Sequence, residues 1–287
     1  METRTGRISR YFARTRLRHK IGAKRTPVGA CRTPNPGDER MSRKALYKLY
    51  WKLQAAIAPG LTDSQQDYED VLDRCAAGEL RWLDVGCGHH LLPTWRFEEE
   101  KKLVGRANFL VGVDADALSL SKHRTIANRV QANIRRLPFA DGAFNLVTAN
   151  MVFEHLDDPD AQLGEIARVL APGGRLIFHT PNKYGYATLM AKLIPEAFKG
   201  RLVYLLHRRK EEDVFPAFYR INSTSDISSI ARRSGFGIEE IRQSNCVAQF
   251  IIVPPLAVLE LLWLRFLMTG AGRTLRPNLI AILQKSA

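Results

Sequence analysis

The sequence predicts an α/β fold in which a doubly wound, mostly parallel seven-stranded sheet holds a ligand at its carboxyl edge. Three observations lead to this prediction. An apolar run of Trp82, Leu83 and Val85 ends in the turn Gly86-Cys87-Gly88. A second apolar run, Phe109–Val113, ends in Asp114. From Leu80 onward strand-like and helix-like segments alternate, which indicates parallel strands joined by right-handed crossovers.

The first part of the chain differs from the rest in charge. Residues 1–50 hold 14 Lys and Arg against 3 Asp and Glu, which accounts for +11 of the net charge of +14. We expect residues 1–40 to be a basic disordered tail, since they contain no apolar stretch long enough for a signal peptide. Three alternatives stay open: an anionic binding partner, a transit-peptide-like segment, or a true start at Met41.

Residues 41–79 are expected to form an N-terminal helical cap of two helices. Apolar residues recur at helical spacing until Pro59-Gly60, and Asp63 is placed to cap the second helix. Whether these helices cover the ligand site or only pack against the sheet edge stays open at this stage.

The glycine turn after the first strand favours a cationic ligand. Glycine lets the backbone bend sharply and approach a bound molecule. Asp84 adds a carboxylate two residues before Gly86, and it would repel a pyrophosphate but attract a positive charge. A dinucleotide fingerprint would also need glycine where Leu91 stands. Asp114, after the second strand, is suited to accept hydrogen bonds from ribose hydroxyls.

The remaining elements follow from local signals. Pro172-Gly173-Gly174 ends a helix before a fifth strand, and Ser223 with Asp226 forms a capping box for a later helix that stops at Gly235. The expected helices are Ala161–Leu170 and Ile227–Ser234, and the expected strands are Arg175–Thr180, Ile238–Arg242 and Asn278–Gln284.

Two segments interrupt the minimal fold. Residues 182–222 are rich in aromatic and basic side chains and are expected to be a lid insertion on the substrate side. Residues 246–274 form an apolar insertion around the strongly apolar stretch 247–268. Pro254-Pro255 leaves a helix of only about 20 Å, too short to span a membrane. It is either a packed lid or an interfacial helix in contact with a membrane surface.

Five blocks, in this order, resemble the Rossmann-like S-adenosylmethionine-dependent methyltransferases. The likeness extends over roughly residues 80–285. It is greatest to the bacterial group that contains the ubiquinone, menaquinone and other small-molecule methyltransferases. The blocks are Asp84–Gly88, Gly112–Asp116, Leu137–Val147, Phe153–Leu156 and Val169–Ile177.

The resemblance implies S-adenosyl-L-methionine as the cofactor and assigns its contacts position by position. The chain departs from the family at His90, where a third glycine is frequent, and at Asn133, where many members have Asp. The implied contacts are Asp84, Gly86, Cys87 and Gly88 for the amino-acid portion, Asp114 for the ribose diol, Ala115, Asn133 and Ile134 for the adenine, and Asn150 for the region of the methyl donor.

Two histidines are candidate catalytic residues. His155, after the fourth strand, and His179, at the end of the fifth, could remove a proton from an oxygen acceptor. Each also has a structural interpretation, as a Glu154-His155 pair and as a hydrogen-bonded strand-end histidine. Quinone methyltransferases that bind a divalent metal use Glu-x-x-Glu-His, and because the first position here is Met151 we expect no metal.

The sequence thus predicts an enzyme that methylates oxygen or carbon of a small or lipid-like acceptor, located in the cytoplasm or peripherally at a membrane. One alternative is a nucleic-acid methyltransferase, although Thr148–Val152 lacks the Asp/Asn-Pro-Pro-aromatic motif and residues beyond 50 are nearly neutral. A second is a non-catalytic, membrane-associated binding module. No nucleic-acid partner is expected, and the four scattered cysteines argue against zinc or a disulfide framework.

Overall fold

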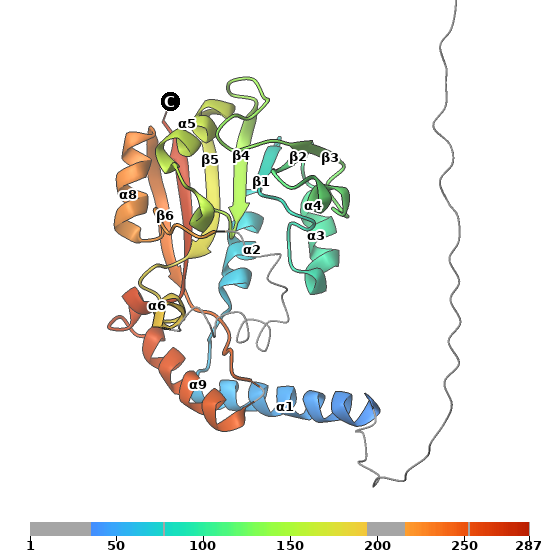
Figure 1. The fold of residues 1–287 in the computed structure, drawn as a ribbon, viewed down its shortest axis with the longest axis vertical. Coiled ribbons are helices and arrows are strands. Elements are labelled where there is room, and N and C mark those ends of the chain that lie inside the picture. The colour runs from blue at the N-terminus through green and yellow to red at the C-terminus, as the bar shows by residue number, and fades with distance from the viewer. Residues whose placement is uncertain (1–35, 77, 194–215, 252, 287) are drawn as a thin grey trace, which may run out of the picture. The chain divides into compact units, whose positions relative to one another are not determined.

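The computed structural model describes residues 36–76, 78–193, 216–251 and 253–286 (Figure 1). The expected basic tail therefore lies almost wholly outside the described residues, as does the middle of the expected lid insertion. The chain divides into two units, Met1–Met41 and Ser42–Ala287. The account below concerns the second unit.

A seven-stranded sheet forms the centre of this unit, in the order β3-β2-β1-β4-β5-β7-β6. Strands β1 to β5 pair in parallel, and β7 runs antiparallel to both of its neighbours. The prediction of a doubly wound, mostly parallel sheet is confirmed. The strands are β1 Arg81–Val85, β2 Phe109–Asp114, β3 Asn128–Gln131, β4 Phe144–Asn150, β5 Leu170–Pro181, β6 Phe236–Ser244 and β7 Asn278–Lys285.

Helices cover both faces of the sheet (Figure 1). The α-helices described are α1 Pro36–Ile57, α2 Ser64–Cys75, α3 Phe97–Val104, α4 Ala117–Ser121, α5 Pro159–Val169, α6 Tyr186–Leu193, α8 Thr224–Arg233 and α9 Pro254–Met268.

Side chains alternate between two cores because successive residues of a strand point to opposite faces. In β1, Leu83 and Val85 join the core under α5 and α8, whereas Trp82 points to the core under α2, α3 and α4. A third apolar cluster lies where α1 meets α9 and includes the buried Tyr50 and Leu264.

The ends of several elements differ from expectation. Helix α5 ends at Val169 rather than Leu170, because Leu170 already pairs with Phe144 at the start of β5. Helix α8 begins earlier than expected, at Thr224, and the hydroxyl of Ser223 accepts the N–H of Asp226 at 3.2 Å, as a cap should.

The carboxyl ends of the parallel strands point toward α2 and α6 (Figure 1). Two hydrogen bonds hold the start of helix α2 at this edge of the sheet. Asn278 of β7 donates to the hydroxyl of Ser64 at 2.9 Å, and the Ser64 N–H donates to the carbonyl of Asn245 at 2.8 Å. No helix among the described residues is both long and apolar enough to cross a membrane.

Candidate functional site

The glycine turn after β1 has a backbone that only glycine adopts without strain. Gly86 has φ +67°, and a Cβ built on it would lie 2.4 Å from Cγ2 of Val152. Gly88 has φ +54°, and a Cβ there would meet nothing within 4 Å. The N–H groups of Gly86 and Cys87 donate to the carbonyl of Val113 at 2.7 and 3.1 Å. The turn is thus closed onto β2 and open to solvent at Gly88.

Cys87 faces the protein interior rather than the open side of the turn. A Cβ on Gly112 would lie 2.8 Å from its Sγ, so the thiol fills the space that this glycine leaves. Burial raises the pKa of the Cys87 thiol far above its ordinary value. The thiol therefore stays protonated, and the residue serves the site through its backbone.

Asp84 is a buried carboxylate at the carboxyl end of β1. The indole N–H of Trp82 donates to the Thr148 hydroxyl at 2.7 Å, and this hydroxyl donates to Asp84 Oδ1 at 2.5 Å. Burial raises the pKa of Asp84 to about 7, against the lowering effect of the Thr148 hydrogen bond. The site therefore holds a carboxyl group whose ionised form is costly until a positive charge lies beside it.

Asp114 connects the two turns of the site. Its Oδ2 accepts the N–H of Gly88 at 2.8 Å, and its Oδ1 accepts the N–H of Asp116 at 2.8 Å. The neighbouring carbonyl of Ala115 accepts a hydrogen bond from Gln131 at 3.0 Å. A carboxylate oxygen has two acceptor positions, so Asp114 keeps capacity for hydroxyl donors beyond these two N–H groups.

Asn150 and His179 lie side by side on β4 and β5, where the strand register pairs them. His179 Nδ1 lies 2.9 Å from Asn150 Oδ1, and since an amide oxygen only accepts, Nδ1 is the donor. Asn150 in turn donates to Gln65 of α2 at 3.2 Å. The His179 ring stacks on Tyr68 of α2, with 5.5 Å between the ring centroids.

His179 itself is poorly suited to act as a base. Its side chain is buried, and burial lowers the pKa of His179 to about 3. The imidazole stays neutral at ordinary pH but has little affinity for a proton. In this arrangement His179 orients the amide of Asn150.

His155 is half-buried and connects the segment after β4 to the described end of the expected lid insertion, residues 216–222. Its Nδ1 lies 2.8 Å from the carbonyl of Pro216, and its Nε2 lies 3.9 Å from Oε1 of the buried Glu154. The other oxygen of Glu154 accepts from the Thr180 hydroxyl at 3.1 Å. The backbone carbonyl of Glu154 accepts the N–H groups of Phe218 and Tyr219. The pair is therefore part of the structural framework, whether or not it also takes part in catalysis.

Asn133 and Ile134 follow β3. Asn133 is exposed, and its Oδ1 accepts the N–H of Arg135 at 2.9 Å, which closes a tight turn. Beside this turn lies an open hollow of about 550 Å³, lined by Gln131, Ala132, Arg136, Leu137, Pro138 and Phe139.

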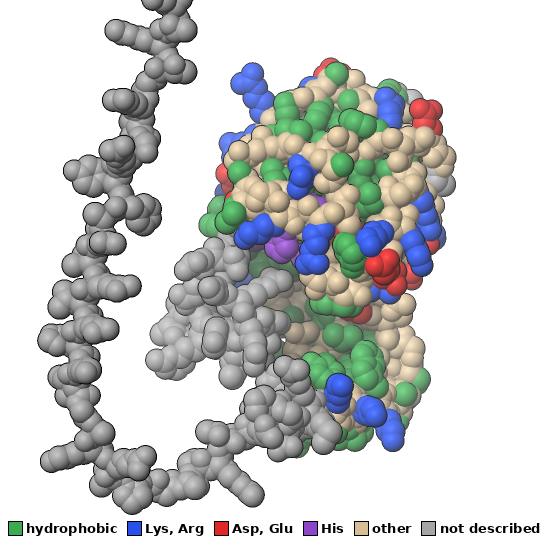
Figure 2. Space-filling model, turned by 90° about the vertical axis from the view of Figure 1, so that its right-hand side faces the viewer, with side chains coloured by type: hydrophobic (Ala, Val, Ile, Leu, Met, Phe, Trp, Pro, Cys, Tyr) green, Lys and Arg blue, Asp and Glu red, His purple; other side chains and the backbone are tan. Residues whose placement is uncertain are grey.

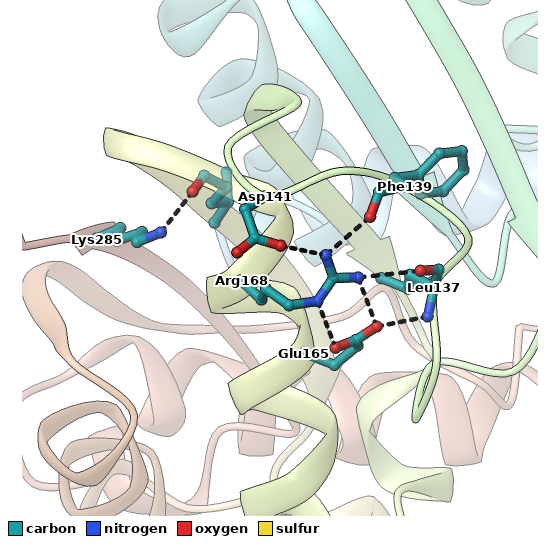
Figure 3. A network of polar contacts seen from close by, with 7 residues as sticks. Leu137, Phe139, Asp141, Glu165, Arg168 and Lys285 are labelled. Carbon is teal, nitrogen blue, oxygen red and sulfur yellow. Dashed lines mark hydrogen bonds and ion pairs between the residues drawn. The ribbon is translucent and has the colours of Figure 1, made fainter.

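Arg168 at the end of α5 fixes one wall of this hollow (Figure 3). Its guanidinium donates to the carbonyls of Leu137 and Phe139 at 3.0 and 2.8 Å. It also forms ion pairs with Glu165 and Asp141 at 2.8 and 2.6 Å. Because a guanidinium has five donors in one plane, a single side chain can hold both carbonyls and both acids.

The structure brings the expected residues of β1, β2, β4 and β5 together at one edge, and adds three that the sequence did not indicate. Thr148 could have been noticed as a polar residue inside an otherwise apolar strand. Tyr68 of α2 follows the apolar spacing of its helix, so the sequence indicated a packing role for it. Gln65 of α2 gave no signal. Within the described ranges, no group of three or more His, Cys, Asp or Glu side chains is placed to hold a metal.

Part of this chain is similar to a known protein family. A sequence profile described as "Methyltransferase domain" matches residues 83–178, from β1 to β5. This part of the chain is a methyltransferase domain of the S-adenosylmethionine-dependent family. The domain thus includes the glycine turn, Asp114, Asn150 and the turn held by Arg168.

Among curated proteins, the chain is similar to a demethylmenaquinone methyltransferase from Mycobacterium sp. (strain KMS), with 33% identity over 143 residues. That alignment covers 48% of this chain and 59% of the relative, so the chain matches little more than half of its length. A ubiquinone biosynthesis O-methyltransferase from Escherichia fergusonii is 25% identical over 181 residues, covering 60% of this chain and 71% of the relative.

The fold is shared with solved structures as well. A protein from Listeria monocytogenes, assigned as an S-adenosylmethionine-dependent methyltransferase, superposes with a TM-score of 0.50. The sequence identity is 14%, and the match covers 78% of this chain and 97% of the other. At this identity the likeness concerns the fold alone.

The methyltransferase domain fits the cofactor that its family implies. The open space at Gly88 leaves room for a ligand to approach the backbone. The buried Asp84 lacks a cationic neighbour among the groups that shift its pKa, and S-adenosylmethionine carries positive charge on its sulfur and its amino group.

Proposed function

We propose that this chain transfers a methyl group from S-adenosylmethionine to oxygen or carbon of a small or lipid-like acceptor. The observation that carries the proposal is the pairing of a buried carboxyl group, Asp84, with the open turn at Gly88. A positive ligand charge at this place would favour the ionised carboxylate. A neutral or anionic nucleotide would gain nothing there.

When bound, S-adenosylmethionine supplies the electrophilic methyl group. The residues of this chain bind and orient it. Asp84 attracts the positively charged amino-acid portion, to which the backbone of Gly86, Cys87 and Gly88 also lies close. Asp114 accepts hydrogen bonds from the ribose hydroxyls.

The adenine and methyl ends of the cofactor are bound by other residues in this proposal. Ala115, Asn133 and Ile134 contact the adenine next to the hollow that Arg168 supports. Asn150, held by His179 and Gln65, lies near the methyl group. Holding donor and acceptor in line at close distance, away from water, is the main contribution of such a site to the rate.

For an oxygen acceptor we assign the base to His155. The hydrogen bond from Nδ1 to the Pro216 carbonyl places the lone pair on Nε2. Glu154, 3.9 Å from Nε2, stabilises the imidazolium formed when Nε2 takes a proton. His179, with its pKa near 3, acts instead as a positioning residue for Asn150.

Calorimetric titration of the full chain with S-adenosylmethionine is the first test. We expect binding by the wild-type protein and at least about tenfold weaker binding by Asp84→Asn, which removes a charged contact but keeps the shape. Absence of binding by folded wild-type protein would overturn the proposal.

The acceptor is then sought directly. The protein is incubated with methyl-labelled cofactor and separate polar and lipid extracts, and the labelled product is identified. His155→Gln should lower kcat for an oxygen acceptor by about 100-fold or more while leaving the cofactor Kd unchanged. An unchanged kcat would remove His155 as the base.

A further inference from the structure

Helix α9 has two apolar faces, and only one of them is packed. Ala257, Leu261, Leu264 and Leu267 are buried against α1 and its neighbours. Five apolar side chains on the opposite side are exposed, with exposed fractions from 37% for Trp263 to 63% for Leu259. We call them the α9 row: Leu256, Leu259, Leu262, Trp263 and Phe266.

The row is continuous along the helix, since its successive spacings of three, three, one and three residues keep to one side of an α-helix. Trp263 and Phe266 touch, with ring centroids 5.2 Å apart. An exposed apolar surface of this kind needs a partner, because leaving it in water costs free energy.

Basic side chains are exposed on the same two helices. On α1, which packs against the buried face of α9, Lys44, Lys48 and Lys52 are exposed and follow one another at intervals of one helical turn. The exposed Arg265 lies on α9 itself and donates to the carbonyl of Ile57 at 2.7 Å. Figure 2, seen from the side on which α1 lies, shows apolar and basic side chains next to one another in the lower part of the molecule.

Among the side chains that the structure describes on α1 and α9, the one acidic group is that of Glu260. Residues 42–62 contain no Asp or Glu. The acid of α9, Glu260, is buried and is used internally: it accepts the hydroxyl of Tyr186 at 3.0 Å and the N–H of Gln249 at 2.7 Å. The exposed surface therefore combines apolar residues, a tryptophan and positive charge.

We propose that the α9 row binds the surface of a bilayer containing anionic phospholipids, with Lys44, Lys48, Lys52 and Arg265 next to the headgroups. Tryptophan is favoured at the boundary between headgroups and acyl chains, and basic side chains are attracted to anionic lipids. A symmetric dimer through the same face is disfavoured, because it would bring the lysines of two copies together. The proposal does not depend on the proposed methyl transfer.

The surface also adjoins the candidate site. Tyr186 of α6 contacts Trp263 edge-on, with ring centroids 6.3 Å apart, and α6 follows the strand that carries His179. A protein bound in this way would present the acceptor side of its site close to the lipid.

The test uses the full chain and vesicles of phosphatidylcholine, alone or with about one third phosphatidylglycerol. Because the basic residues before position 41 could bind anionic vesicles by charge alone, co-sedimentation is measured in about 0.1 M salt and again in about 0.5 M salt, where the attraction of all exposed basic residues to the headgroups is screened and the apolar contribution remains. We expect Leu259→Gln/Leu262→Gln to weaken binding to the mixed vesicles at least about tenfold. Leu118→Gln/Ile238→Gln, which removes two exposed apolar residues elsewhere, should bind like wild type.

Insertion is measured separately by quenching of tryptophan fluorescence with lipids brominated on their acyl chains. Wild type should be quenched, and Trp263→Phe should lose most of this quenching while still co-sedimenting. Unchanged cosedimentation and quenching in the Leu259/Leu262 variant would overturn the proposal. Failure of the wild-type protein to bind vesicles would also overturn it. In that case, a dimer of the wild type in solution that is absent in the Leu259/Leu262 variant would show that the row binds a second copy instead.

Discussion

Asp84 links the charge of the candidate site to pH. It is buried at the carboxyl end of β1, and its pKa is raised to about 7. Without a ligand the carboxyl group is therefore partly protonated at neutral pH. Binding of a cation beside it favours the ionised form, so that cation binding and proton release are coupled.

We expect the affinity for S-adenosylmethionine to rise with pH between about 5.5 and 7.5, by up to about tenfold per pH unit below the pKa. Titration calorimetry at several pH values measures this change. Asp84→Asn should bind weakly throughout and lack the pH dependence. Asp73→Asn, which removes an exposed carboxylate of α2, should keep the wild-type profile. A pH dependence that persists in Asp84→Asn would assign it to another group.

The same carboxyl group affects folding in the opposite direction. The ordinary pKa of 3.8 applies to the unfolded chain, and the value of about 7 to the folded one. Between these pH values the unfolded chain releases the proton first, so raising the pH lowers the free energy of unfolding, by up to about 4 kcal/mol in total. Urea unfolding at about pH 5 and about pH 8 should show about 2 to 3 kcal/mol of this loss in wild type and none in Asp84→Asn.

At the scale of single residues, the sequence predicted the acids and glycines of the site but not the groups that hold them. Asp84 lies near the end of one apolar run and Asp114 follows another, so their place at the end of a strand could be derived. Gln65 and Tyr68 are far from Asn150 and His179 in the sequence. Their contacts depend on where α2 packs against the sheet, and local sequence patterns do not predict this position.

The turn between β1 and the following segment depends on glycine for two separate reasons. Gly86→Ala should lower the free energy of unfolding by about 3 kcal/mol, because it adds a left-handed alanine and a clash with Val152. Gly78→Ala has a similar φ but open space around it, and should cost only about 1 kcal/mol. The double variant Gly86→Ala/Val152→Ala should recover the difference in urea unfolding. If both single variants cost the same, the clash contributes nothing.

The turn that lines the hollow depends on Arg168. Arg168→Lys keeps the charge but cannot hold two carbonyls and two acids, and we expect a loss of about 1 to 2 kcal/mol in urea unfolding together with weaker cofactor binding. The matched control is Arg135→Lys, because the Arg135–Asp157 pair at 2.8 Å is exposed and should contribute little. Equal effects of the two substitutions would show that the Arg168 contacts are not specific.

At the scale of elements, periodicity and capping residues located most helices, while their boundaries depended on pairing. Ser223 marked the start of α8 within a few residues. The start of β5 was missed because Leu170 pairs with Phe144 ahead of the Pro172–Gly174 bend, and this pairing depends on β4.

At the scale of the whole molecule, β7 is an interior strand of the sheet. It lies between β5 and β6 and pairs with both. The side chains of Leu279, Ala281 and Leu283 belong to the core under α5 and α8, and those of Ile280 and Ile282 to the opposite core. The sequence predicted a strand here, but its position inside the sheet is a property of the assembled fold.

A chain ending at residue 277 should therefore fail to fold cooperatively, since β6 would lose its pairing partner, β5 would keep only β4, and both cores would be open. Circular dichroism during urea unfolding and limited proteolysis measure this. The full chain should show a single transition and resist the protease. A truncated chain with a sigmoidal transition would show that the first five strands fold without β7.

Because Trp82 is connected to Asp84 through the hydroxyl of Thr148, the fluorescence of Trp82 should report the charge of this carboxyl group. An indole that donates its N–H toward a carboxyl group emits at a wavelength that depends on the charge of that group. In a variant with Trp51, Trp95 and Trp263 replaced by Phe, the emission of Trp82 should shift between acidic and neutral solution, and again when cofactor is added. This change in emission would report cofactor binding next to Asp84 without a label, and it would not require the methyl acceptor to be known.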